Sequence, residues 1–143
     1  MVDIPTLDIE DYDPELNEEE ESVEDKSGGA LTYAIVGAGQ GGGRMAKAFY
    51  DMGYTKTIAV NTARSDLNGL DLPEEQKFLV DEHGEQGAGK DQAKAEAAIE
   101  RKEQEVFNKF REVFGTNVDR ILICLGVSGG SGGGTVNTLI KVA

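Results

Sequence analysis

Residues 126–135, Gly-Val-Ser-Gly-Gly-Ser-Gly-Gly-Gly-Thr, carry the clearest chemical signal in this chain. They follow an apolar run at residues 121–125 and precede residues that can begin a helix. A loop almost without side chains between a strand and a helix turns consecutive backbone N–H groups toward one point, and such a point binds phosphate. A second stretch of this type, residues 37–43, follows an earlier apolar segment. Two such loops predict one ligand with several phosphates.

The elements that must position these loops can be predicted from apolar patterning. Short apolar segments predict strands at residues 31–36, 57–60, 77–80 and 120–125. Helical spacing predicts helices over residues 44–52 and 91–114, and a last helix begins after the second glycine loop. This alternation predicts an α/β, Rossmann-like fold, in which a mostly parallel sheet is flanked by helices. A strand order of 3-2-1-4 would make the two loops neighbours.

Apolar residues at helical spacing should face the core of the protein. On the first helix they are Met45, Ala48, Phe49 and Met52. On the long helix they are Ala95, Ile99, Val106, Phe110 and Val113. Cys124 lies among Ile and Leu in the fourth strand, so we expect a small core residue rather than a reactive thiol.

Residues 1–29 form an acidic segment that differs sharply from the rest of the chain. The net charge of −13 is concentrated there, because residues 1–27 hold twelve acidic residues against one lysine, a balance of −11. Few large apolar residues are present, so the segment cannot bury enough surface to offset its ordering entropy, and we expect a disordered tail. A docking segment for a basic partner is the alternative. Residues 30–143 then form one domain.

The composition argues against several classes of function. The chain has no basic stripe for nucleic acid, and no apolar run approaches the ~20 residues of a membrane span. Its N-terminus is acidic and unlike a signal peptide. The single cysteine excludes an internal disulfide and suits a reducing cytoplasm. We therefore expect a cytoplasmic protein without a membrane or nucleic-acid partner.

The first glycine loop also satisfies the dinucleotide-binding fingerprint. Gly37, Gly39 and Gly42 have G-x-G-x-x-G spacing between a predicted strand and a predicted helix. That fingerprint expects an acid near the end of the second strand, but the strand runs into Asn61 and the nearest acid is Asp66. The second glycine loop has no role in such a site, so an NAD(P)-binding domain is the weaker alternative.

Two enzymatic motifs match less well. A P-loop requires a lysine after its glycines, and no lysine follows either main glycine loop. Residues 129–133 match the G-x-S-x-G nucleophile elbow of serine hydrolases, with Ser131 as the nucleophile. The only histidine, His83, lies upstream, whereas the histidine of such hydrolases follows later in the chain. A glycine-saturated loop matches this pattern by chance, so a hydrolase is a minor alternative.

Four segments, in this order, resemble the nucleotide-binding loops of the tubulin/FtsZ superfamily. They are residues 34–44 (AIVGAGQGGGR), 58–62 (IAVNT), 87–91 (GAGKD) and 128–134 (SGGSGGG). The last resembles the tubulin signature, with Ser131 in place of its threonine and Gly133 in place of a small side chain. Gln40 is more similar to eukaryotic tubulin and the archaeal CetZ group than to FtsZ, and Ala63 stands where FtsZ commonly has aspartate. The resemblance covers about residues 31–143 and implies an N-terminal, truncated part of a GTP-binding domain.

The resemblance implies nucleotide contacts at three places. Around the α- and β-phosphates it implies Gly39, Gln40, Gly41 and Gly42, with Gln40 near a metal-bound water and Arg44 either a contact or a surface residue. Around the β- and γ-phosphates it implies backbone N–H groups among Gly126, Ser128, Gly129, Gly130, Ser131, Gly132, Gly133, Gly134 and Thr135. Asn61 and Thr62 end the second strand, and Ala88, Gly89 and Lys90 would face the γ-phosphate. For Lys90, a solvent-exposed position at a helix start is the alternative.

The resemblance also implies a function. Proteins of this superfamily bind GTP and GDP with Mg²⁺, polymerise into filaments and hydrolyse GTP at subunit junctions. No residue here resembles a general base, so catalysis would rest on positioning and on charge stabilisation around Mg²⁺. An acidic loop of the neighbouring subunit, outside this chain, would activate water. The altered signature loop motivates the alternative of a nucleotide-binding scaffold that does not hydrolyse.

Overall fold

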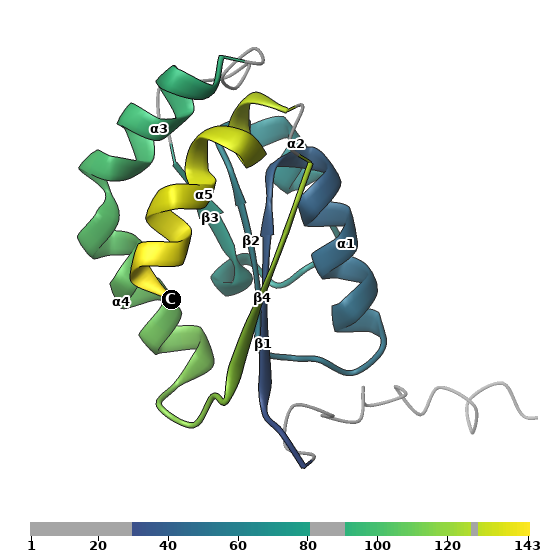
Figure 1. Cartoon of the computed structure of the whole chain (residues 1–143). Coiled ribbons are helices and arrows are strands. Elements are labelled where there is room, and N and C mark those ends of the chain that lie inside the picture. Colours follow the sequence, from purple (N-terminus) through teal and green to yellow (C-terminus); the bar gives the residue numbers. More distant parts are fainter. Residues whose placement is uncertain (1–29, 81–90, 127–128) are drawn as a thin grey trace, which may run out of the picture.

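Four parallel strands form the sheet (Figure 1). They are β1 (Tyr33–Ala38), β2 (Thr57–Asn61), β3 (Lys77–Leu79) and β4 (Arg120–Leu125). The order along the sheet is β3-β2-β1-β4, with Ala38 of β1 opposite Val60 of β2 and Leu125 of β4. The predicted α/β fold class and strand order are confirmed. Because β1 and β4 are parallel neighbours, the segments that follow them begin side by side at the carboxyl ends of the strands.

This computed structural model describes residues 30–80, 91–126 and 129–143. The predictions for the acidic tail at residues 1–29 therefore lie outside the described residues, and so do those for His83 and for Ala88, Gly89 and Lys90. Ser128 also lies outside them.

Helices cover both faces of the sheet. On one face lie α1 (Gly39–Asp51) and α2 (Arg64–Asn68), and on the other lie α3 (Gln92–Arg101), α4 (Glu103–Phe114) and α5 (Gly130–Val142). A 3-10 turn, η2 (Glu74–Gln76), leads into β3. Strands of such a sheet are apolar on both faces, as parallel strands between two helical layers must be.

The core therefore has two halves. Ala34, Val36 and Ala38 of β1 join a cluster with α3, α4 and α5, while Ile35 joins Ala46 of α1 and Cys124 of β4 on the opposite face. The predicted core residues Ala95, Ile99, Val106 and Phe110 are buried, and Val113 packs against the same cluster. Cys124 is a buried core residue, as predicted, and burial raises the pKa of its thiol.

The observed helices differ from the predicted ones at three places. The first helix begins at Gly39 rather than at Arg44, so the first glycine stretch forms its opening turn instead of a loop. The second glycine stretch likewise enters α5 at Gly130. The predicted long helix is two helices, α3 and α4, separated at Lys102, whose φ of −109° and ψ of 14° interrupt the helical path.

The predicted apolar face of the first helix is wrong except at Phe49, which packs against the cluster of Ile35, Ala46 and Cys124, whereas Ala48 is exposed. Met45 and Met52 are 49% and 51% exposed, and the buried positions of α1 are Gly39, Gly42, Gly43 and Ala46. A Cβ atom at Gly42 would lie 2.2 Å from the carbonyl oxygen of Cys124. Helix α1 therefore packs with its smallest residues against the backbone of the sheet, which excludes the methionines from that contact.

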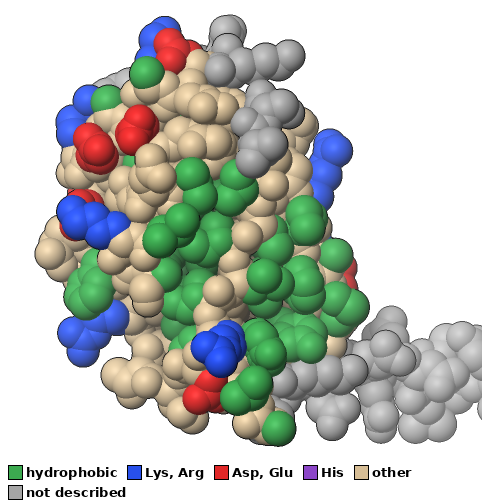
Figure 2. Space-filling model, in the orientation of Figure 1, with side chains coloured by type: hydrophobic (Ala, Val, Ile, Leu, Met, Phe, Trp, Pro, Cys, Tyr) green, Lys and Arg blue, Asp and Glu red, His purple; other side chains and the backbone are tan. Residues whose placement is uncertain are grey.

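Apolar side chains gather over β4 and the adjoining helices (Figure 2). Leu122 of β4 and Ile140 of α5 are 41% and 62% exposed. Among the described residues, β4 pairs with β1 only, so its outer edge is a sheet edge. None of the described helices is long and apolar enough to cross a membrane.

Candidate phosphate-binding site

Two helix N-termini meet at the end of β1 and β4. Helix α1 begins at Gly39, directly after the last residue of β1, and α5 begins at Gly130, a few residues after β4. Gly39 has a φ of +76°, and a Cβ atom there would lie 2.9 Å from the backbone nitrogen of Gly132. That left-handed φ and that close approach both require glycine. The two glycine stretches therefore adjoin at one end of the sheet.

Neither of these helices has a side-chain N-cap among the described residues. The N-cap positions are Ala38 for α1 and Gly129 for α5, and neither first turn contains an acidic residue. By contrast, Asp91 caps α3 and accepts a hydrogen bond from the Lys94 nitrogen at 3.2 Å. The first N–H groups of a helix have no partner inside it and lie at its positive end. At the starts of α1 and α5, no described side chain accepts a hydrogen bond from these N–H groups.

The surface beside the start of α1 is open. Gln40 and Gly41 are exposed, and a Cβ atom at Gly41 would meet nothing within 4 Å. Gly132 is different, because a Cβ atom there would lie 3.0 Å from the carbonyl oxygens of Ala38 and Gly126. Gly132 therefore allows the close approach of the two loops, whereas Gly41 borders free space.

The end of β2 is connected to the start of α5 by two hydroxyl groups. Thr62, which is 2% exposed, places its Oγ1 2.5 Å from the Oγ of Ser131. The backbone oxygen of Ser131 accepts a hydrogen bond from the Thr135 hydroxyl at 2.6 Å. The sequence predicted each residue as a nucleotide contact but not their contact with each other. The available signal was that a hydroxyl residue follows each of β2 and β4, the two strands on either side of β1.

Asn61 shapes the turn between β2 and α2. Its Oδ1 accepts a hydrogen bond from the Ala63 nitrogen at 3.0 Å, and its Nδ2 donates to Asp66 at 3.2 Å. The Asn61 side chain is 2% exposed. Asp66, the nearest candidate for a ribose-binding acid in a dinucleotide site, is thus engaged by Asn61 within this turn.

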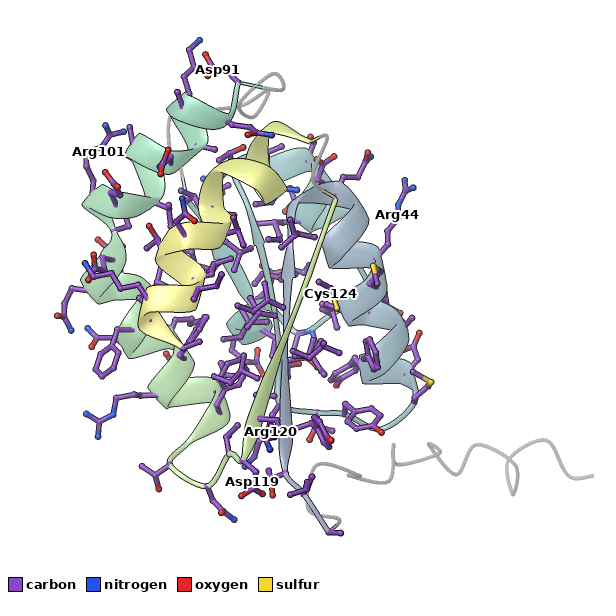
Figure 3. The ribbon with its side chains drawn as sticks, in the orientation of Figure 1. Arg44, Asp91, Arg101, Asp119, Arg120 and Cys124 are labelled. Atoms are coloured by element: carbon purple, nitrogen blue, oxygen red, sulfur yellow. The ribbon has the colours of Figure 1, made fainter. Side chains whose placement is uncertain are left out.

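The other predicted site residues have different surroundings. Gly42 and Gly134 allow close packing, since a Cβ atom at Gly134 would lie 2.3 Å from the Gln92 oxygen of α3. Thr135 is buried. The Arg44 side chain projects outward from α1 (Figure 3) and is exposed. Gly133 donates its N–H to the Gly129 oxygen at 3.2 Å, which places it in the first turn of α5.

Few of the described residues at the site have titratable side chains. No group of three His, Cys, Asp or Glu side chains within residues 30–80, 91–126 and 129–143 could hold a metal ion. The Ser131 hydroxyl, candidate nucleophile of a hydrolase, faces Thr62. What the arrangement supplies is backbone N–H groups and two helix N-termini, which together suit the binding of phosphate groups.

Comparison with known proteins shows which fold this is. No family model matches the chain. The chain is 34% identical over 121 residues to the tubulin-like protein CetZ5 of Haloferax volcanii, which covers 78% of the chain and 31% of CetZ5. The structure of CetZ1 from the same organism, a GDP-bound monomer, has a TM-score of 0.69 at 30% identity, over 76% of this chain and 36% of CetZ1.

A second structure is similar to the same extent. CetZ2 of Haloferax volcanii, in a GTPγS-bound protofilament, has a TM-score of 0.67 at 27% identity, over 76% of this chain and 34% of CetZ2. The chain spans about a third of the length of the curated relatives it matches. On sequence and fold together, the chain is similar to about a third of a CetZ protein, and its parallel sheet flanked by helices matches the fold of tubulin/FtsZ-like proteins.

Proposed function

We propose that this chain is the phosphate-binding part of a longer protein that binds GTP, polymerises into filaments and hydrolyses GTP at subunit junctions. The approach of Gly39 to Gly132 carries the proposal, because it brings two uncapped helix N-termini to one point. The relatives agree with it, since CetZ1 is a GDP-bound monomer and CetZ2 a GTPγS-bound protofilament.

The residues present fit a polyphosphate. The open start of α1, at Gln40 and Gly41, would contact the α- and β-phosphates, and the first turn of α5 at Gly130 and Ser131 would contact the β- and γ-phosphates. Thr62 would orient Ser131 through their hydroxyl contact. These contacts hold charge in place, which is the main requirement of phosphoryl-transfer catalysis.

Mg²⁺ would accompany the nucleotide. The described part of the chain offers no carboxylate cluster for it, so the ion would be held mainly by phosphate oxygens and water, with Gln40 near one such water. When bound, Mg²⁺ would neutralise the charge that develops on the phosphates. We place the protein in the cytoplasm, because its single cysteine suits a reducing compartment.

A scaffold that binds nucleotide without hydrolysis is the second candidate. The altered signature stretch supports it, since Ser131 and Gly133 stand where the tubulin signature has threonine and a small side chain. The two candidates differ in whether phosphate is released after assembly.

Nucleotide titration and phosphate release test the proposal. The 143-residue chain should bind GTP weakly in calorimetry and show no turnover. The longer protein should release phosphate at a rate per molecule that rises with protein concentration, because the acidic loop comes from the next subunit. Absence of GTP binding by both proteins would contradict the proposal. Assembly without phosphate release would favour the scaffold, and hydrolysis by the 143-residue chain alone would contradict the division of roles.

Deletion of residues 2–27 should leave GTP affinity unchanged within twofold. The segment holds twelve acidic residues against one lysine and few large apolar residues, so it offers little that could contact a phosphate. Calorimetric titration of the intact and shortened proteins with GTP measures the effect. A tenfold loss of affinity on deletion would show that the tail takes part in the site.

A further inference from the structure

A cavity lies at the end of the sheet opposite the phosphate site. It has a volume of about 500 Å³ and lies between α4, the start of β4 and the end of α5. Its apolar wall is formed by Phe107, Phe110, Phe114, Val118, Ile121 and Val142. The rings of Phe110 and Phe114 are 5.1 Å apart, and Phe107 is 40% exposed. Phe110 and Phe114 are buried at the base of this wall, so Phe107 is its exposed aromatic ring, and such an apolar surface is suited to large apolar side chains.

Two arginines flank the aromatic wall. The Arg111 guanidinium lies 5.8 Å from the centre of the Phe107 ring, and Arg120 lines the cavity at the start of β4 (Figure 3). Asp119, the acidic residue between them, accepts a hydrogen bond from the Thr32 nitrogen at 2.8 Å. An occupant with apolar side chains and acidic neighbours would match this combination.

The N-terminal segment enters the fold beside this cavity. The Thr32 oxygen accepts hydrogen bonds from the nitrogens of Asp119 and Arg120, at 2.9 and 3.2 Å, and both of these residues line the cavity. Thr32, the described residue nearest to this segment with such contacts, is therefore held at the cavity wall. A short flexible tether gives an effective concentration in the millimolar range, so that even a weak contact is populated.

One part of the tail has the matching chemistry. Residues 11–16, Asp-Tyr-Asp-Pro-Glu-Leu, hold the one aromatic residue of the segment, Tyr12, together with Leu16 and three acids. Pro14 restricts the backbone and lowers the entropy lost on docking. Fifteen residues separate Leu16 from Thr32. A flexible chain of that length spans roughly 20 Å, which is enough to turn back to a cavity beside its own attachment point.

We propose that residues 11–16 dock into this cavity within the same molecule. Tyr12 and Leu16 pack against the phenylalanines, and the acidic side chains of the segment face Arg111 and Arg120. The contact lies at the opposite end of the strands from the two glycine stretches, so it is independent of nucleotide binding.

Paramagnetic relaxation in the intact 143-residue chain tests the proposal. A nitroxide is attached to a cysteine introduced as Glu18→Cys, while the buried Cys124 stays unlabelled. Amide protons of Phe107, Val118 and Ile121 should relax at least threefold faster than in the same labelled protein carrying Tyr12→Ser and Leu16→Ser. Because that variant keeps the tether, the difference reports docking alone. Arg111→Glu should also reduce the enhancement, whereas its matched control on α3, Arg101→Glu, should not.

Three results would overturn the proposal. The first is equal relaxation in the parent protein and the Tyr12→Ser, Leu16→Ser variant. The second is enhancement at the groove beside β3 that Lys77, Lys102 and Lys109 line, instead of at the cavity. The third is the same enhancement when spin-labelled, isotopically silent chains are mixed with unlabelled ¹⁵N chains, since the occupant would then be a second copy.

Discussion

Replacement of Gly42 by alanine is expected to destabilise the fold by on the order of 4 kcal/mol. The added Cβ atom would lie 2.2 Å from the carbonyl oxygen of Cys124 and 3.2 Å from the backbone carbon of Gly37. Both neighbours are backbone atoms of the paired strands β1 and β4, so no side chain can rotate to make room. Helix α1 would have to move away from the sheet. Urea denaturation followed by circular dichroism measures the loss.

The adjacent residue provides a matched control. A Cβ atom at Gly41 would meet nothing within 4 Å, and the residue lies in the same helical turn. Alanine there should stabilise the protein by up to about 1 kcal/mol, because alanine is a better helix former than glycine. If the two alanine variants unfolded at the same urea concentration, the close packing of α1 on the sheet would be wrong.

Replacement of Gly41 by glutamate should weaken GTP binding at least tenfold while the protein remains folded. A carboxylate in the first turn of α1 interacts favourably with the helix N-terminus, so the fold should be as stable as before or more so. The same charge would compete with a phosphate for the N–H groups. Repulsion between unit charges about 4 Å apart amounts to roughly 1–4 kcal/mol in surroundings between water and a protein surface.

Gly41→Gln separates charge from size in that experiment. Glutamine has nearly the same shape as glutamate but no charge. The Gly41→Gln variant should therefore bind GTP almost as tightly as the unmodified chain, as measured by calorimetric titration. Equal losses in the glutamate and glutamine variants would show that steric blocking, rather than charge, is responsible. No loss in either variant would argue that the phosphates do not lie at the start of α1.

The strands and their order were predictable because their signals are local and agree with one another. Each strand is a short apolar run, and parallel pairing with right-handed crossovers leaves few orders to choose from. The position of the glycine stretches after β1 and β4 followed from this order. That the two stretches adjoin could therefore be anticipated before the structure was known, whereas the particular approach of Gly39 to Gly132 could not.

The helix starts were not predictable from propensity. Glycine is among the poorest helix formers, so a helix that opens with Gly39 and contains Gly41, Gly42 and Gly43 contradicts local preference. Packing decides instead, because only residues without side chains let α1 lie against the carbonyl of Cys124. The same requirement reversed the predicted apolar face and left Met45 exposed.

Two further features have no local signal. The break at Lys102 falls among good helix formers, with neither glycine nor proline in the predicted helix, so tertiary packing against α5 and the sheet must set it. The hydroxyl contact between Thr62 and Ser131 joins residues 69 apart in the sequence. Such a contact depends on how distant strands pair with one another, and no short stretch of the sequence contains that information.

The pairing of β1 with β4 has a consequence for the order of folding. The hydrogen bond from the Thr32 nitrogen to Asp119 spans 87 residues, and Ala38 pairs with Leu125 across the same interval. Long-range closure of this kind is slow compared with local structure formation. During synthesis, β1, α1 and β2 emerge from the ribosome well before β4 and α5. The starts of α1 and α5 therefore come together only after β4 has been made and has paired with β1, so the earlier part of the chain presents the start of α1 alone.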